Sequence, residues 1–111
     1  MDAEIKRKWV EALRSGKYAQ TKSHLRDEHG YCCLGVLCDL IAPNDWQSNV
    51  EDDVFKHRRA NSFPHPEVLA TAGIEGNTDC DEPVHPLWTA AHMNDDGRTF
   101  AEIADYIEGY L

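Results

Sequence analysis

The chain has 111 residues, a length typical of one folded domain, and we expect residues 1–111 to form a single domain. Apolar residues make up 41% of the chain and charged residues 28%, which is typical of a globular protein and excludes a fibrous or fully disordered chain. The longest run of apolar residues and glycine, residues 31–38, is far shorter than the ~20 residues of a membrane span. We therefore expect no membrane association, no signal peptide and a cytoplasmic location.

Charge is distributed unevenly along the chain, whose net charge is −9. Such a charge repels nucleic acid at long range, so we expect no direct nucleic-acid partner. Residues 1–26 hold seven Lys and Arg against three Asp and Glu, whereas residues 27–111 hold four against seventeen. The basic first quarter either pairs with the acidic remainder, the commoner arrangement, or binds an anionic ligand locally.

The first 41 residues predict a helix, a hairpin and a second helix. Asp2 is a good N-cap and apolar residues recur at helical spacing after it, which predicts a helix over residues 3–15. The loop at residues 27–30 is typical of a β-hairpin. A strand over 31–33 then leads into a buried helix over 34–41, in which Gly35 is understandable if another backbone passes close by.

The second half carries weaker signals until its last helix. Residues 43–65 show little periodicity and either contain a short strand around 50–55 or form a functional loop. We then predict a helix over 67–72 with Pro66 in its first turn, a loop over 74–86, and one or two helical turns over 87–93. Thr99 and Glu102 form a capping box that starts the final helix. The predicted fold class is α+β: one small domain with a short β-hairpin or small antiparallel sheet packed with about four helices.

Four cysteines allow two interpretations. Cys32 and Cys33 are adjacent, which disfavours a disulfide between them, and the segment around them is apolar. A cysteine at a helix N-terminus has a lowered pKa, so either residue is a candidate nucleophile with His57, His65 or His85 as its base. We favour the alternative that these cysteines are reduced and packed in the core, and we predict no catalytic residue.

Metal and cofactor motifs are absent from the sequence. The pairs Cys33/Cys38, Cys80/His85 and His85/His92 do not have the short spacing that zinc sites use. The acidic turn at residues 94–97 lacks the bidentate glutamate of a calcium loop, and no glycine-rich phosphate loop is present. We therefore predict no metal and no cofactor.

Two segments combine cations with aromatic residues, the combination that binds the phosphate and base of a nucleotide. One runs from residue 16 to residue 22 and leads to Arg26; the other covers residues 55–59, with Trp46 and Phe63 nearby in sequence. Solvated loops are the alternative interpretation of both segments. The predicted ligand-binding residues are Lys17, Gln20, Lys22, Arg26, Trp46, Lys56, Arg58 and Arg59.

Both ends of the chain resemble a family of small proteins of phage and prophage genomes. The resemblance is carried by residues 8–18, by the block Tyr-Cys-Cys-Leu-Gly-Val-Leu-Cys at residues 31–38, and by the closing block at residues 93–105. It implies a context rather than a reaction: an accessory protein that acts against host defences in the host cytoplasm, either by blocking a host protein or by sequestering an immune nucleotide signal.

Three hypotheses follow from these observations. The first, which we favour, is a non-enzymatic sponge for a cyclic nucleotide or an ADP-ribose-like molecule, working as a homo-oligomer whose interfaces form the pocket. The second is an inhibitor whose acidic segments, residues 51–53 and 79–82, mimic nucleic acid and bind a basic host protein. The third, the least favoured, is a cysteine-dependent hydrolase.

Overall fold

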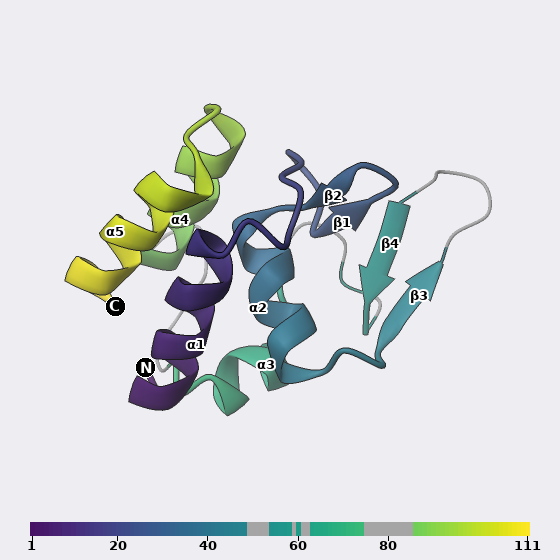
Figure 1. Ribbon diagram of the computed structural model, residues 1–111. Coiled ribbons are helices and arrows are strands. Elements are labelled where there is room, and N and C mark those ends of the chain that lie inside the picture. Colours follow the sequence, from purple (N-terminus) through teal and green to yellow (C-terminus); the bar gives the residue numbers. More distant parts are fainter. Residues whose placement is uncertain (49–53, 59, 61–62, 75–85) are drawn as a thin grey trace.

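The computed structural model describes residues 1–48, 54–58, 60, 63–74 and 86–111 (Figure 1). These residues form a small α+β protein, as predicted, with five helices rather than about four. The helices are α1 (Ala3–Arg14), α2 (Cys33–Ile41), α3 (Pro66–Thr71), α4 (Pro86–Asp95) and α5 (Phe100–Tyr110). The strands are β1 (Arg26–Asp27), β2 (Gly30–Tyr31), β3 (Trp46–Ser48) and β4 (Val54–His57).

Helix α1 confirms the prediction to within one residue at its C-terminal end. The Asp2 carboxylate accepts a hydrogen bond from the backbone N–H of Ile5 at 3.0 Å, which satisfies one of the open donors of the first turn. Trp9, Val10 and Leu13 are buried on the inner face of the helix. Their burial against the other helices is what stabilises a helix of this length.

The four strands form one antiparallel sheet in the order β2-β1-β4-β3. The β1–β2 hairpin confirms the predicted turn, although β2 covers Gly30–Tyr31 rather than residues 31–33. The predicted strand at 50–55 overlaps β4 at residues 54–55 only, because β4 covers Val54–His57; residues 50–53 lie outside the described part of the chain. Because β1 also pairs with β4, Arg26 lies directly opposite both Tyr31 and Phe55.

Helix α2 begins at Cys33, one residue earlier than predicted, because Cys32 caps it. The Cys32 sulfur accepts a hydrogen bond from the backbone N–H of Gly35 at 3.3 Å. A Cβ on Gly35 would lie only 1.8 Å from the carbonyl oxygen of Leu25. The backbone of Leu25 therefore passes close to Gly35, which explains a glycine inside this helix.

The C-terminal half is more helical than the sequence predicts. The helix predicted at 67–72 is present as α3, and α4 has ten residues instead of one or two turns. The capping box of α5 is confirmed: the Thr99 hydroxyl accepts from the backbone N–H of Glu102 at 3.2 Å, and the Glu102 side chain accepts from the Thr99 N–H. Most of the predicted loop at 74–86 lies outside the described residues.

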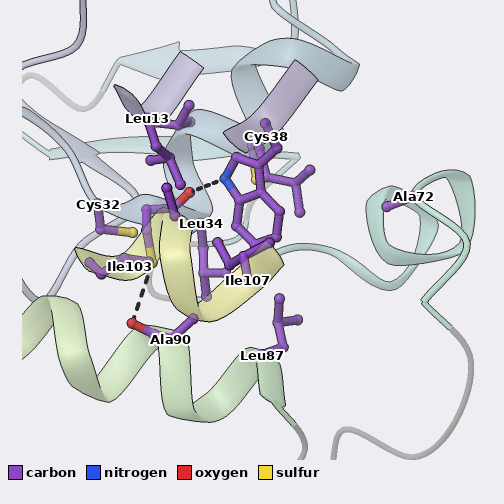
Figure 2. Close-up of a cluster of buried hydrophobic side chains, with 14 of the residues drawn as sticks. Leu13, Cys32, Leu34, Cys38, Ala72, Leu87, Ala90, Ile103 and Ile107 are labelled. Carbon is purple, nitrogen blue, oxygen red and sulfur yellow. Dashed lines mark hydrogen bonds between the residues drawn. The ribbon is translucent and has the colours of Figure 1, made fainter. Parts of the chain in front are cut away.

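Helix α2 lies between the sheet on one side and α1, α4 and α5 on the other (Figure 1). The core fills the space among these helices (Figure 2). Within it, hydrogen bonds of Cys33 connect α2 to α1 and to α4. The Trp9 indole N–H donates to the Cys33 carbonyl oxygen at 2.9 Å, and the Cys33 thiol donates to the Ala90 carbonyl oxygen at 3.5 Å. In the described part of the chain, no helix has the length and apolar character needed to cross a bilayer.

Candidate functional site

One face of the sheet carries a half-buried arginine surrounded by aromatic rings. The guanidinium carbon of Arg26 lies 4.3 Å from the ring centroid of Phe55, 4.9 Å from that of Tyr31 and 5.4 Å from that of Trp46. These distances are within the range of cation–π attraction. We call these four residues the Arg26 cluster. It joins the two segments that the sequence analysis singled out, because Arg26 belongs to the first and Phe55 to the second.

The aromatic side of the cluster is fixed in place by Asp39 of α2. Its carboxylate accepts hydrogen bonds from the Trp46 indole N–H at 3.0 Å and from the Tyr18 hydroxyl at 2.7 Å. Tyr18 in turn packs edge-to-face on Tyr31, with ring centroids 4.9 Å apart. Burial, together with the hydrogen bond to Asp39, raises the pKa of Tyr18. Asp39 therefore positions two of the three rings around Arg26, Trp46 directly and Tyr31 through Tyr18.

The charge of Arg26 is not neutralised by a carboxylate of any described residue. The other arginines that the structure describes each form an ion pair: Arg7 with Glu11, Arg14 with Asp105 and Glu108, Arg58 with Asp45 and Glu67, and Arg98 with Glu102. In a chain of net charge −9, this difference distinguishes Arg26 from the surface arginines. A half-buried guanidinium whose N–H groups donate to no described side chain is suited to bind a phosphate or carboxylate.

The remaining predicted ligand-binding residues that the structure describes do not converge on this cluster. Gln20 donates hydrogen bonds to the side chain of Asn94 at 3.0 Å and to the carbonyl oxygen of Arg98 at 2.7 Å, so its amide connects parts of the fold. Arg58 donates to Asp45 at 2.6 Å and to Glu67 at 3.0 Å, which neutralises its charge.

The predicted lysines are also placed elsewhere. Lys56 pairs with Gln47 across β3 and β4, one residue out of phase with Phe55, and so lies on the opposite face of the sheet. Lys17 is exposed in an open groove beside Tyr18, and Lys22 is exposed. Arg59 lies outside the described residues, as do the acidic segments 51–53 and 79–82.

The described cysteines are buried free thiols, as the favoured interpretation predicts. Burial raises the pKa of Cys32 to about 11 and raises the pKa of Cys33 as well, so both thiols are protonated at neutral pH. Burial outweighs the effect of the helix N-terminus that a reactive cysteine would use. These thiols therefore lack the chemistry of an activated nucleophile.

The histidines considered as bases have structural contacts instead. The buried His57 ring is bonded through Nε2 to the Ala42 carbonyl oxygen at 2.8 Å, and His65 accepts from the N–H of Glu67 at the start of α3. His85 and Cys80 lie outside the described residues. Among the residues that the structure describes, no group of three or more His, Cys, Asp or Glu is arranged to hold a metal ion.

A cavity of about 160 Å³, which no sequence motif indicates, lies between the loop before β1, the start of α2, and α4. We call it the α2–α4 cavity. Phe63 and Trp88 stack at its side, with ring centroids 4.3 Å apart. No spacing motif connects its residues, so only the pairing of distant segments reveals it. Its lining consists of Ser23, His24, Cys32, Leu34, Phe63, Trp88, Ala91, His92 and Asp95.

Comparison with known proteins identifies the family of the chain. A family model described as "Domain of unknown function (DUF8296)" matches residues 1–111. The chain belongs to the DUF8296 family. No curated protein and no solved structure matches the chain. Because the family description states no activity, we argue the function from the geometry of the sites.

Proposed function

We propose that this DUF8296 protein is a non-catalytic binding protein that sequesters a nucleotide, with the phosphate on Arg26 and the base against the rings of the Arg26 cluster. The observation that carries the proposal is the half-buried Arg26 guanidinium, which has three aromatic neighbours and no carboxylate partner among the described residues. A phosphate supplies the missing anion and forms charge-assisted hydrogen bonds.

The aromatic neighbours favour a nucleotide over inorganic phosphate. Tyr31, Trp46 and Phe55 are each partly exposed, so each ring retains surface for contact with a ligand. Stacking of a base on an aromatic side chain contributes about 1–3 kcal/mol. Because Asp39 fixes Trp46 and Tyr18 in advance, little conformational entropy is lost on binding.

Sequestration is favoured over turnover because the described residues provide no activated nucleophile. The thiols are protonated at neutral pH and His57 is committed to a backbone carbonyl. A bound nucleotide is therefore expected to be released intact. In the phage context that the sequence resemblance implies, removal of a free nucleotide signal would suppress a host defence.

The proposal is tested by titration calorimetry of the whole chain with AMP, ADP-ribose and a cyclic dinucleotide. We expect saturable binding of at least one of these ligands, and a loss of affinity of at least tenfold in Arg26→Gln and in Arg26→Lys, since lysine lacks the planar fork of arginine. Chromatography of the released ligand should show no chemical change.

Arg7→Gln is the matched control, because Arg7 is exposed on α1 and paired with Glu11. It should bind as the unmodified protein does. Thermal unfolding of each variant establishes that the fold is retained. Absence of binding to every nucleotide, or equal affinity of Arg26→Gln and the unmodified protein, would reject the proposal.

A further inference from the structure

The α2–α4 cavity has an apolar floor and a polar mouth. Leu34 is fully buried and Cys32 is 6% exposed, so both lie at the floor, and the partly buried Ala91 of α4 adds to the apolar lining. Ser23 and Asp95, in contrast, are exposed residues at its edge. This arrangement of apolar walls with a few convergent polar groups is the usual form of a small-molecule site.

The size of the cavity limits what it can hold. Its volume of about 160 Å³ is close to the ~150 Å³ of an engineered apolar cavity that admits a benzene ring. The rings of Phe63 and Trp88, which stack on each other with an inclination of 14°, supply an apolar aromatic wall. A six-membered ring therefore matches the volume and the apolar lining, whereas a larger ligand would have to project from the mouth.

The mouth offers a hydrogen-bond acceptor in a fixed orientation. One oxygen of the Asp95 carboxylate, Oδ1, accepts from the backbone N–H of Ser23 at 2.9 Å. Its other oxygen, Oδ2, accepts no hydrogen bond from a described residue. Asp95 is the one carboxylate among the described lining residues, and it repels a phosphate while it attracts an N–H donor.

From these observations we infer that the α2–α4 cavity is a second ligand site, which binds an uncharged six-membered heteroaromatic ring carrying an amino group, as in cytosine. The ring packs between the floor and the Phe63–Trp88 wall, and the amino group donates to Asp95. The site is distinct from the Arg26 cluster in chemistry as well as position, because the cluster binds an anion. The inference does not depend on the proposed function.

Two neutral probes that differ by one amino group test the inference: 2-aminopyrimidine and pyrimidine. Binding is followed by calorimetry and by quenching of tryptophan fluorescence, to which Trp88 in the cavity lining contributes. We expect 2-aminopyrimidine to bind more tightly than pyrimidine by about fivefold, since the difference is one hydrogen bond to a solvent-exposed carboxylate. The dissociation constant of cytosine is expected to be similar to that of 2-aminopyrimidine.

Two variants locate the binding. Asp95→Asn keeps the acceptor oxygen for the backbone N–H of Ser23 and removes the negative charge. The affinity for 2-aminopyrimidine should therefore fall by about fivefold, and the affinity for pyrimidine should not change. Ala91→Leu fills the cavity and should abolish binding of both probes. Ala101→Leu, on the exposed side of α5, is the matched control and should bind normally.

Thermal unfolding shows that each variant remains folded. The inference is overturned if neither probe binds at millimolar concentration, if Ala91→Leu binds as well as Ala101→Leu, or if Asp95→Asn weakens both probes equally. Arg26→Gln should retain full affinity for 2-aminopyrimidine. Loss of nucleotide binding at Arg26 can thus be distinguished from loss of 2-aminopyrimidine binding in the α2–α4 cavity.

Discussion

The side chain of Asn94 joins the end of α4 to the start of α2: its Oδ1 atom accepts from the backbone N–H of Cys33 at 3.2 Å. Asn94 is fully buried, and its Nδ2 atom donates to the carbonyl oxygen of Thr21 at 2.8 Å. Gln20 donates to the same Oδ1 atom. One buried amide therefore holds together three segments that are distant in sequence and that border both candidate sites.

Asn94→Ala should lower the free energy of unfolding by about 2–4 kcal/mol. The substitution leaves the N–H of Cys33 and the carbonyl of Thr21 without their side-chain partner. A buried polar group without a partner destabilises the fold by more than a formed hydrogen bond stabilises it. Urea denaturation followed by far-ultraviolet circular dichroism measures the change. Asn44→Ala, an exposed control, should change the stability by less than about 0.5 kcal/mol. Equal effects of the two substitutions would contradict the role of Asn94.

Gly35→Ala should destabilise the fold by about 3 kcal/mol or more. The new Cβ would lie 1.8 Å from the Leu25 carbonyl oxygen, and this contact can be relieved only if the backbone around Leu25 moves away from α2. The control is Gly109→Ala in α5, where no atom lies within 4 Å of an added Cβ. Because alanine loses less backbone entropy in a helix, this control should gain about 0.5 kcal/mol. Thermal unfolding of both variants tests the pair, and a stable Gly35→Ala variant would refute the close approach.

Ionisation of the Cys32 thiol should lower the free energy of unfolding at high pH. Its pKa is about 11 in the folded protein and about 9 for an ordinary thiol, so the unfolded chain releases the proton first as pH rises. The contribution of the thiol is therefore complete below pH 9 and is lost as pH rises from 9 to 11. The stability difference between the unmodified protein and Cys32→Ala should shrink by about 2 kcal/mol over this range. A pH-independent difference in urea denaturation would contradict the raised pKa.

Thr99→Ala should lower the free energy of unfolding by about 1 kcal/mol through the loss of the α5 cap. The Thr99 hydroxyl satisfies the N–H of Glu102, which has no partner within the helix. Thr99→Ser keeps that hydroxyl and should restore most of the stability. The comparison is made by thermal unfolding, and identical values for the alanine and serine variants would show that the hydroxyl does not contribute.

The elements predicted well from the sequence are those whose signals are local. Asp2 and the Thr99–Glu102 capping box lie next to the helices that they start. The pairing of β1 with β4 could not be predicted, because it joins residues that are far apart in the chain.

The candidate sites were predictable only in part for the same reason. Cations and aromatic residues were recognised as a suitable combination, but the contact between Arg26 and Phe55 follows from strand pairing. Arg58 has the same side-chain chemistry, yet Asp45 and Glu67 neutralise it. The α2–α4 cavity had no signal in the sequence, since its wall pairs Phe63 with Trp88 across a long stretch of chain.

The most direct test of the central claim is the ultraviolet absorbance of the small molecules released by heat from the protein after purification from a nucleotide-rich lysate. We predict that the unmodified protein releases a molecule absorbing near 260 nm in stoichiometric amount, that Arg7→Gln does the same, and that Arg26→Gln releases almost none. A protein that releases no such molecule, or an Arg26→Gln variant that releases as much as the unmodified protein, would contradict the claim that Arg26 holds a nucleotide.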